Sequence, residues 1–156
     1  MDIKSFKKIL YMAWTIDTCI PLLRDKFNKD NKSLGQSDVT ALVVNDCYGG
    51  KIMCCMTSIG SYYYNLIDDK IVDLTDEQFL GEIPLYNEGR EITREFLLND
   101  DDTRLRYIML LKNVKSILEN LLIYNSIKPE EFINDCTMRK KQIERMMRYN
   151  EYEQMG

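Results

Sequence analysis

The segment SDVTALVVNDC, residues 37–47, decides the fold, because its centre at residues 41–44 is an unbroken apolar run. Serine is a favoured N-cap residue, so Ser37 is expected to cap a helix over this segment. Apolar side chains cover nearly all sides of that helix, which indicates that it is buried and that Gly49-Gly50 ends it. The β-branched residues of the run leave a strand as the competing interpretation.

Two further helices are expected on the N-terminal side. In residues 2–14 apolar side chains recur at helical spacing, and Asp2 can cap the first turn. The recurring positions are Ile3, Phe6, Leu10 and Ala13 or Trp14. A second, short helix is expected within residues 18–27, where Pro21 is tolerated only in the first turn. The polar residues 28–36 predict a loop.

A small antiparallel sheet is expected at about residues 51–74. Its three predicted strands are 51–57, 61–67 and 70–74. Asp68-Asp69 would form the tight turn of a hairpin between the last two strands. N-terminal helices followed by such a sheet predict an α+β fold.

Helices dominate the prediction for the C-terminal half. A helical turn is expected at residues 76–80 and a short helix at about 90–98, on either side of a loop with Pro84 and Gly89. The acids at 100–102 precede a long amphipathic helix, whose N-terminal dipole they would favour. Its predicted apolar stripe comprises Leu105, Ile108, Leu111, Val114, Leu118 and Leu121, and Asn125-Ser126 would end it.

Composition points to one globular domain. The chain has 156 residues, of which 45% are hydrophobic and 29% charged. Its net charge of −4 argues against binding to nucleic acid or an anionic membrane through bulk charge. The chain shows neither a signal-peptide pattern nor a membrane-spanning stretch, so a cytoplasmic protein without a membrane partner is expected. Its five cysteines, an odd number, then favour free thiols, and no cofactor is expected.

Several short motifs along the chain together resemble the YunG family of bacterial proteins. They are Ala13-Trp14, the segment 35–42 with Asp46 and Gly49-Gly50, the segment 60–65, Asp73-Leu74-Thr75, Gln78-Phe79, Arg94, Leu97-Leu98, Thr103, Arg106-Tyr107 and Leu110. The resemblance covers roughly residues 8–115 of a single domain, 1–156. Residues from about 116 to 156 would form a C-terminal helical extension. The resemblance implies no established activity.

Two positions of the resemblance bear on chemistry. Family members typically carry Gly-Gln-Cys where this chain has Gly35-Gln36-Ser37, and Gly-Ser-His where it has Gly60-Ser61-Tyr62. A Cys that opens a buried helix, then a His and an Asp on successive strands, is similar to papain-like and transglutaminase-like enzymes. The helix N-terminus would lower the thiol pKa, the His would take the proton and the carboxylate would orient the His. The resemblance thus implies a possible papain- or transglutaminase-like core, with Gln36 suited to oxyanion stabilisation and Asp73 as the orienting acid.

This chain departs from that pattern at both decisive positions. Ser37 replaces the thiol, and a serine hydroxyl needs a base in order to attack. The sequence contains no histidine, and a tyrosine such as Tyr62 has an ordinary pKa of about 10. We therefore expect no catalysis, and Gln36, Ser37, Tyr62 and Asp73 would form a degenerate site. The alternative is a hydrolase or transferase in which Lys51 or Lys70 is the base for Ser37.

Other side chains on the sheet invite functional interpretations that packing explains better. Tyr62 and Tyr64 share one strand face and could mark a partner-binding surface, although core packing is the preferred interpretation. Cys54-Cys55 point to opposite faces of a strand, so they cannot easily chelate a metal together. Asp68 and Asp69 lie in a turn where Asp is common. No metal site is expected.

The segment at 129–148 predicts a last helix with a basic end, formed by Arg139, Lys140, Lys141, Arg145 and Arg148. Packing against the core with a solvated charged face is the preferred interpretation, and contact with a partner is the alternative. The leading functional hypothesis is a non-catalytic protein-binding or regulatory module with an unknown protein partner. The alternative to it is an inhibitor, carried on a mobile element, that uses this helix to bind nucleic acid, a nuclease complex or another ribonucleoprotein.

Overall fold

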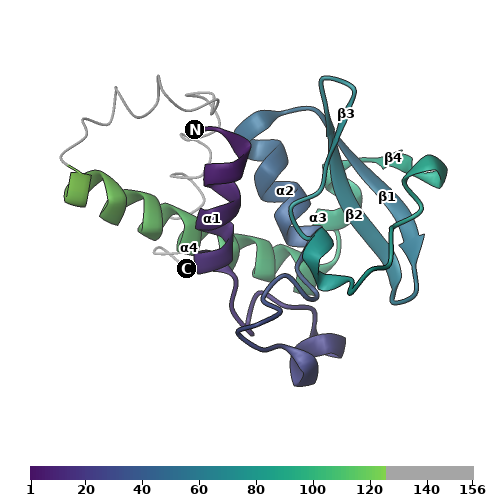
Figure 1. The fold of residues 1–156 in the computed structure, drawn as a ribbon, viewed down its shortest axis with the longest axis horizontal. Helices are drawn as coiled ribbons and strands as arrows, with labels where there is room; N and C mark the ends of the chain where they lie inside the picture. The colour runs from purple at the N-terminus through teal and green to yellow at the C-terminus, as the bar shows by residue number, and fades with distance from the viewer. Residues whose placement is uncertain (126–156) are drawn as a thin grey trace.

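The computed structural model describes the backbone of residues 1–125 and the side chains of residues 1–123 (Figure 1). Four α-helices, three short 3₁₀ helices and four strands follow one another in this part of the chain. They are α1 (Ile3–Ala13), η1 (Pro21–Lys26), α2 (Ser37–Tyr48), β1 (Lys51–Thr57), β2 (Gly60–Ile67), β3 (Lys70–Val72), η2 (Asp76–Gln78), η3 (Tyr86–Glu88), β4 (Arg90–Ile92), α3 (Arg94–Leu98) and α4 (Asp101–Asn125). The predicted α+β class is confirmed.

The sheet is antiparallel throughout, with the strand order β3-β2-β1-β4. β1 and β2 pair along their whole length, with Cys54 opposite Tyr63. The predicted turn between β2 and β3 is confirmed. Asp68 and Asp69 have positive φ angles of 49° and 59°, which a type I′ turn requires and which Asp tolerates better than most residues.

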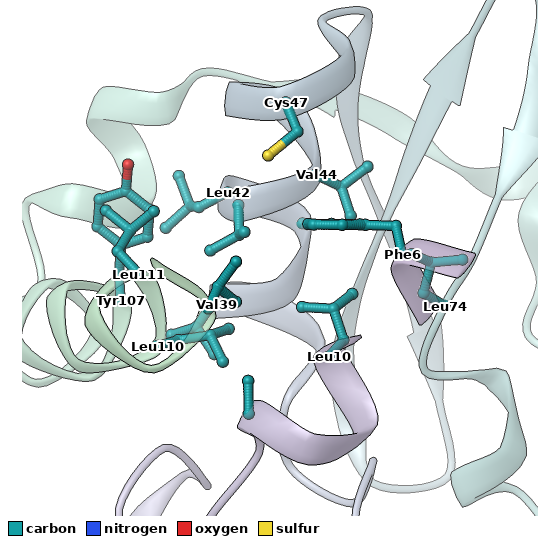
Figure 2. Close-up of a cluster of buried hydrophobic side chains, with 14 of the residues drawn as sticks. Phe6, Leu10, Val39, Leu42, Val44, Cys47, Leu74, Tyr107, Leu110 and Leu111 are labelled. Carbon is teal, nitrogen blue, oxygen red and sulfur yellow. The ribbon is translucent and has the colours of Figure 1, made fainter. Parts of the chain in front are cut away.

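Helix α2 lies between the sheet on one side and α1 and α4 on the other (Figure 1). Its apolar run is buried on every side, which confirms the predicted helix and makes the competing strand wrong. Figure 2 shows Val39, Leu42 and Val44 of α2 among side chains from both neighbouring helices. Those neighbours are Phe6 and Leu10 of α1 and Tyr107, Leu110 and Leu111 of α4.

A buried ion pair joins the N-terminal turn of α2 to α4. Nη2 and Nη1 of Arg106 lie 2.6 and 3.0 Å from the two carboxylate oxygens of Asp38, and Nε lies 2.6 Å from Asp102. Burial alone would lower the pKa of Arg106, but hydrogen bonds and charge from Asp38 and Asp102 raise it above its ordinary value. Asp38 is therefore a buried carboxylate whose charge is compensated through two parallel hydrogen bonds.

A second network holds the other end of α2. Arg94 of α3 lies 3.0 Å from the carboxylate of Asp46, and the Tyr107 hydroxyl donates a hydrogen bond to the same carboxylate. Arg94 also donates to the carbonyl oxygen of Leu42 at 3.1 Å and to the side chain of Asn45 at 3.0 Å. Both buried acids of α2 are thus paired with cations that follow the sheet in the chain.

The structure corrects three sequence predictions. Residues 90–92 form strand β4 rather than the start of a helix. The helix begins only at Arg94, because Thr93 is the N-cap of α3 and its hydroxyl accepts a hydrogen bond from the Phe96 N–H. The predicted helix within 18–27 is a 3₁₀ helix, η1. Leu105 was placed on the buried stripe of α4 but is 64% exposed. Asp38 draws Arg106 into the core, so the buried face of α4 is turned toward Thr103, Arg106 and Tyr107.

The remaining predictions for the C-terminal part fall largely outside the structure. The predicted helix at 129–148 and its basic residues lie outside the described residues. α4 crosses position 116 without a break. Between residues 1 and 125 the structure contains no helix with the length and apolar character needed to cross a membrane. Cys19, Cys47, Cys54 and Cys55 are buried free thiols, as predicted for them.

Replacing Arg106 with Met should lower the free energy of unfolding by about 3–5 kcal/mol, because it leaves the buried Asp38 carboxylate without a cation. Urea denaturation of the full chain measures this. Arg104→Met is the matched control on the same helix, since the Arg104 side chain is 45% exposed and the Arg106 side chain 4%. The control should cost about 1 kcal/mol or less. Equal losses in the two variants would contradict the assigned role of the pair.

Candidate functional site

The candidate site lies where the N-terminal end of α2 meets β2. Ser37 is the first residue of α2, and Gln36 occupies the N-cap position without a capping bond from its side chain. The prediction that Ser37 caps the helix is therefore wrong. Its Oγ instead accepts a hydrogen bond from the backbone N–H of Tyr63 at 3.3 Å. β3 pairs with β2 only at residues 65–67, so the Ser37 hydroxyl satisfies an N–H beyond the end of β3.

Gln36 is fully buried and holds together two segments distant in sequence. Its Nε2 donates to the carbonyl oxygen of Thr15 at 3.1 Å, just beyond the end of α1. Its Oε1 is buried and has no hydrogen-bond partner among residues 1–125. The neighbouring Gly35 N–H donates to Oε1 of Gln78 at 3.3 Å. The amide nitrogen that would stabilise an oxyanion thus donates to the backbone.

Tyr62 and Asp73 form a direct pair. The Tyr62 hydroxyl lies 2.7 and 2.8 Å from the two carboxylate oxygens of Asp73 and 2.9 Å from Oγ1 of Thr75. A second phenol, that of Tyr86, donates to Asp73 at 2.7 Å, and the backbone N–H of Thr75 donates at 3.0 Å. The Asp73 carboxylate therefore accepts bonds from two phenols, one hydroxyl and one amide.

Burial sets the protonation of this cluster. Burial, followed by the nearby Asp73 charge, raises the pKa of Tyr62 far above its ordinary range. Burial and the hydrogen bond to Asp73 raise the pKa of Tyr86 in the same way. Burial also raises the pKa of Asp73, against the hydrogen bonds that lower it. Both phenols therefore keep their protons at neutral pH, and Tyr62 cannot accept a proton from Ser37.

The cluster fixes the loop that follows β3 against one face of the sheet. The ring of Phe79 packs edge-on against that of Tyr62, with 4.8 Å between the ring centroids. The ring of Tyr86 packs in the same way against that of Tyr64, with 4.9 Å between the centroids. The hydroxyl of Tyr64 donates to the carbonyl oxygen of Tyr86 at 3.2 Å. Tyr62 and Tyr64 share a face, as predicted, but both are buried, so packing accounts for them and neither presents a surface to a partner.

The two lysines weighed as bases lie at the opposite end of α2 from Ser37. α2 has 12 residues and is about 18 Å long, and Lys51 begins the strand that follows its C-terminal end. Lys51 pairs with Glu91 at 3.5 Å. Lys70 lines a surface pocket with Tyr48, at the same C-terminal end of α2. The structure does not bring either amine to the Ser37 hydroxyl.

In residues 1–123 the thiols and acids do not form a reactive or metal-binding cluster. Burial raises the pKa of Cys19 and of Cys55 to about 11, so both remain protonated at neutral pH. Within the part of the chain that the structure describes, no group of three or more Cys, Asp or Glu side chains could hold a metal ion.

Two members of the site are not predicted by the sequence. Tyr86 lies in a stretch that has no periodicity and was interpreted as a loop, so nothing in the sequence linked it to Asp73. Thr75 lies in the family motif Asp73-Leu74-Thr75, yet only the structure shows that its hydroxyl and amide both contact the Asp73 carboxylate. Arg94 and Arg106 likewise belong to family motifs, but the sequence does not indicate that they pair with Asp46 and Asp38.

Comparison with known proteins gives one family and one curated relative. The family described as YunG protein matches residues 2–119. The protein YunG of Bacillus subtilis (strain 168), described as uncharacterized, is 34% identical over 77 residues, which are 49% of this chain and 63% of the relative. The matched part is thus less than two thirds of that relative's length. No solved structure matches.

Tyr62→Phe should lower the free energy of unfolding by about 1–3 kcal/mol, because Asp73 stays buried and loses one of its donors. The pKa of Asp73 should rise further for the same reason. Tyr11→Phe is the control, since its hydroxyl makes one exposed hydrogen bond, to the carbonyl oxygen of Lys29. Thermal or urea unfolding of both variants measures the difference. A Tyr62→Phe protein as stable as the Tyr11→Phe protein would show that this hydroxyl does not support the cluster.

Proposed function

We propose, from the premise that the chain belongs to the YunG family, that it is a non-catalytic member acting as a protein-binding or regulatory module. The observation that carries the proposal is the Tyr62–Asp73 pair. The Tyr62 hydroxyl lies 2.7 and 2.8 Å from the two carboxylate oxygens of Asp73 and donates a hydrogen bond to that carboxylate. In the papain-like interpretation, Tyr62 stands where a histidine would take a proton. A phenol with a strongly raised pKa holds its proton instead.

The nucleophile position supports the same proposal. A serine attacks only when a base removes its proton, and the whole sequence contains no histidine. The Asp73 carboxylate accepts hydrogen bonds from Tyr62, Tyr86 and Thr75, and within residues 1–125 it makes no hydrogen bond with Ser37. The alternative of a Ser37 hydrolase with Lys51 or Lys70 finds no support in the geometry.

The residues that carry the family resemblance have structural roles that need no chemistry. The Trp14 indole donates to Oγ1 of Thr40 at 2.9 Å, and the Asn65 amide donates to the carbonyl oxygen of Ala41 at 3.0 Å. Asp38 is held by the buried Arg106, and Asp46 by the partly buried Arg94. A scaffold with these contacts intact, and without a proton acceptor at Ser37, suits recognition better than turnover.

A protein partner fits the described surface better than nucleic acid does. Several large apolar side chains are exposed, among them Leu22, Leu80 and Ile83. Exposed apolar groups of this kind mark protein contacts more often than phosphate contacts. The nucleic-acid alternative rests on Arg139, Lys140 and Lys141, which lie outside the described residues.

A fluorophosphonate probe, which reacts with activated serines, should leave Ser37 unlabelled from about pH 6 to pH 10, a range that reaches close to the ordinary lysine pKa. Intact-mass and peptide mass spectrometry of the full chain measure the labelling, with a serine protease as the positive control for the probe. Ser37→Ala should shift the mass by the substitution alone and likewise show no added probe. Labelling of Ser37 that disappears in Ser37→Ala and in Lys51→Met or Lys70→Met would establish a serine enzyme and overturn the proposal.

A further inference from the structure

A group of exposed apolar side chains lies at the turn of the β1–β2 hairpin. We call it the hairpin-end patch; its members are Ile59, Leu80, Ile83 and Leu85. Leu80 is 98% exposed and Ile83 77%. Soluble proteins rarely present a contiguous group of large apolar side chains unless it contacts another molecule.

Hydrogen bonds hold the two segments of the patch together. The Glu82 carboxylate accepts from the backbone N–H of Ser58 at 2.9 Å and from its hydroxyl at 2.6 Å. Ser58 directly precedes Ile59, and Glu82 directly precedes Ile83. The hairpin turn and the loop after η2 are therefore neighbours in space, although Ser58 and Glu82 are 24 residues apart in sequence.

The loop that carries the patch is anchored on both sides. Phe79 packs against the Tyr62 ring before it, and Tyr86 is hydrogen-bonded to Asp73 after it. Pro84 is buried between the exposed residues Ile83 and Leu85. The patch is thus presented in a fixed arrangement, which reduces the entropy lost on binding.

A cavity adjoins the patch. It has a volume of about 280 Å³ and is lined by Cys54, Cys55, Met56, Glu88 and Arg90. The cavity is linked to the patch through Glu88, whose backbone N–H donates to the carbonyl oxygen of Leu85 at 3.0 Å. Glu88 is exposed at the cavity and pairs with no cation among residues 1–123, so it offers an acceptor to an incoming Lys or Arg.

The charge around the patch is acidic. No Lys or Arg occurs in residues 52–69 or 71–89, which form the hairpin and the loop. Glu82 and Glu88 are exposed on the loop. Asp76 and Glu77 share the single cation of Lys7, at 3.3 and 3.0 Å. Arg90, at the cavity, is the cation that borders this region.

We propose that the hairpin-end patch binds a protein segment whose apolar side chains are flanked by Lys or Arg. The inference rests on the proposed binding function and names its surface and the chemistry of its partner. Acidic residues around an apolar patch attract basic flanks and repel an anionic membrane. A second copy bound through the same face would bring Glu82 and Glu88 of both copies together, so self-association through it is disfavoured.

The test uses two synthetic 18-residue helical peptides, one with Leu on one face and Lys elsewhere, the other with Glu in place of Lys. Fluorescence anisotropy measures their binding to the full chain at low and at physiological salt. The Leu/Lys peptide should bind at least about tenfold more tightly than the Leu/Glu peptide. Leu80→Ser with Ile83→Ser should weaken its binding by about tenfold or more.

Two variants make the test specific. Leu22→Ser removes another exposed leucine, 80% exposed, from η1 and should change binding less than about twofold. Glu88→Gln should weaken binding of the Leu/Lys peptide and make that binding less sensitive to salt, because one attractive charge is lost. No binding, equal binding of the two peptides, or an equal effect of Leu22→Ser would overturn the proposal.

Two further outcomes would also overturn it. One is a wild-type dimer, seen by analytical ultracentrifugation, that Leu80→Ser with Ile83→Ser dissociates. The other is patch-dependent binding to vesicles of phosphatidylglycerol and phosphatidylcholine. These results are distinct from failure of the non-catalytic proposal, since all patch variants keep Ser37. If the patch test fails while Ser37 stays unlabelled, only the assignment of the binding surface is wrong. If Ser37 is labelled, the non-catalytic function itself is wrong.

Discussion

The fold depends on the charge compensation of one buried acid, Asp38, by Arg106. A carboxylate in the first turn of an all-round buried helix costs several kcal/mol unless a cation meets it, because burial removes its hydration. Arg106 meets it with two parallel hydrogen bonds. Asp46 lies eight residues later, about two turns along the same face of α2, and is met by Arg94 and Tyr107. These pairs fix the rotation of α2 about its axis, and that rotation sets where every other polar group of the helix points.

The candidate site follows from that placement. With α2 fixed, Ser37 reaches the Tyr63 backbone amide beyond the end of β3, and Thr40 reaches the Trp14 indole. Tyr62 lies on the other face of β2, where it meets Asp73 and the loop that Phe79 and Tyr86 anchor. Under the proposed function, a tyrosine–aspartate pair occupies the positions of a proton-transfer pair and serves to hold a loop. The same loop then carries the apolar side chains that a partner would contact.

Local sequence patterns predict most of the helices and strands. The partners of individual side chains depend on tertiary contacts, which those patterns do not contain. The helix at α1, the apolar helix α2 and the Asp68-Asp69 hairpin follow from capping, periodicity and turn chemistry, and the structure confirms them. The prediction that Ser37 caps α2 is wrong because its hydroxyl accepts a hydrogen bond from the backbone of Tyr63, a strand residue 26 positions later. The predicted burial of Leu105 is wrong because the predicted stripe contains only apolar residues, whereas the buried face of α4 includes Arg106. Tyr86 and the three-residue strand β4 carry no local signal, and their positions depend on the folded sheet.

Native-state hydrogen exchange of the full chain tests most directly whether α2 is the element on which the rest depends. The amides of Leu42, Val43 and Val44 should exchange only through global unfolding, so their opening free energy should equal the free energy of unfolding from urea denaturation. The Tyr63 amide, bonded to Ser37, should be protected with them. Exchange of the α2 amides at opening free energies several kcal/mol below the global value, while the sheet remains protected, would contradict the account.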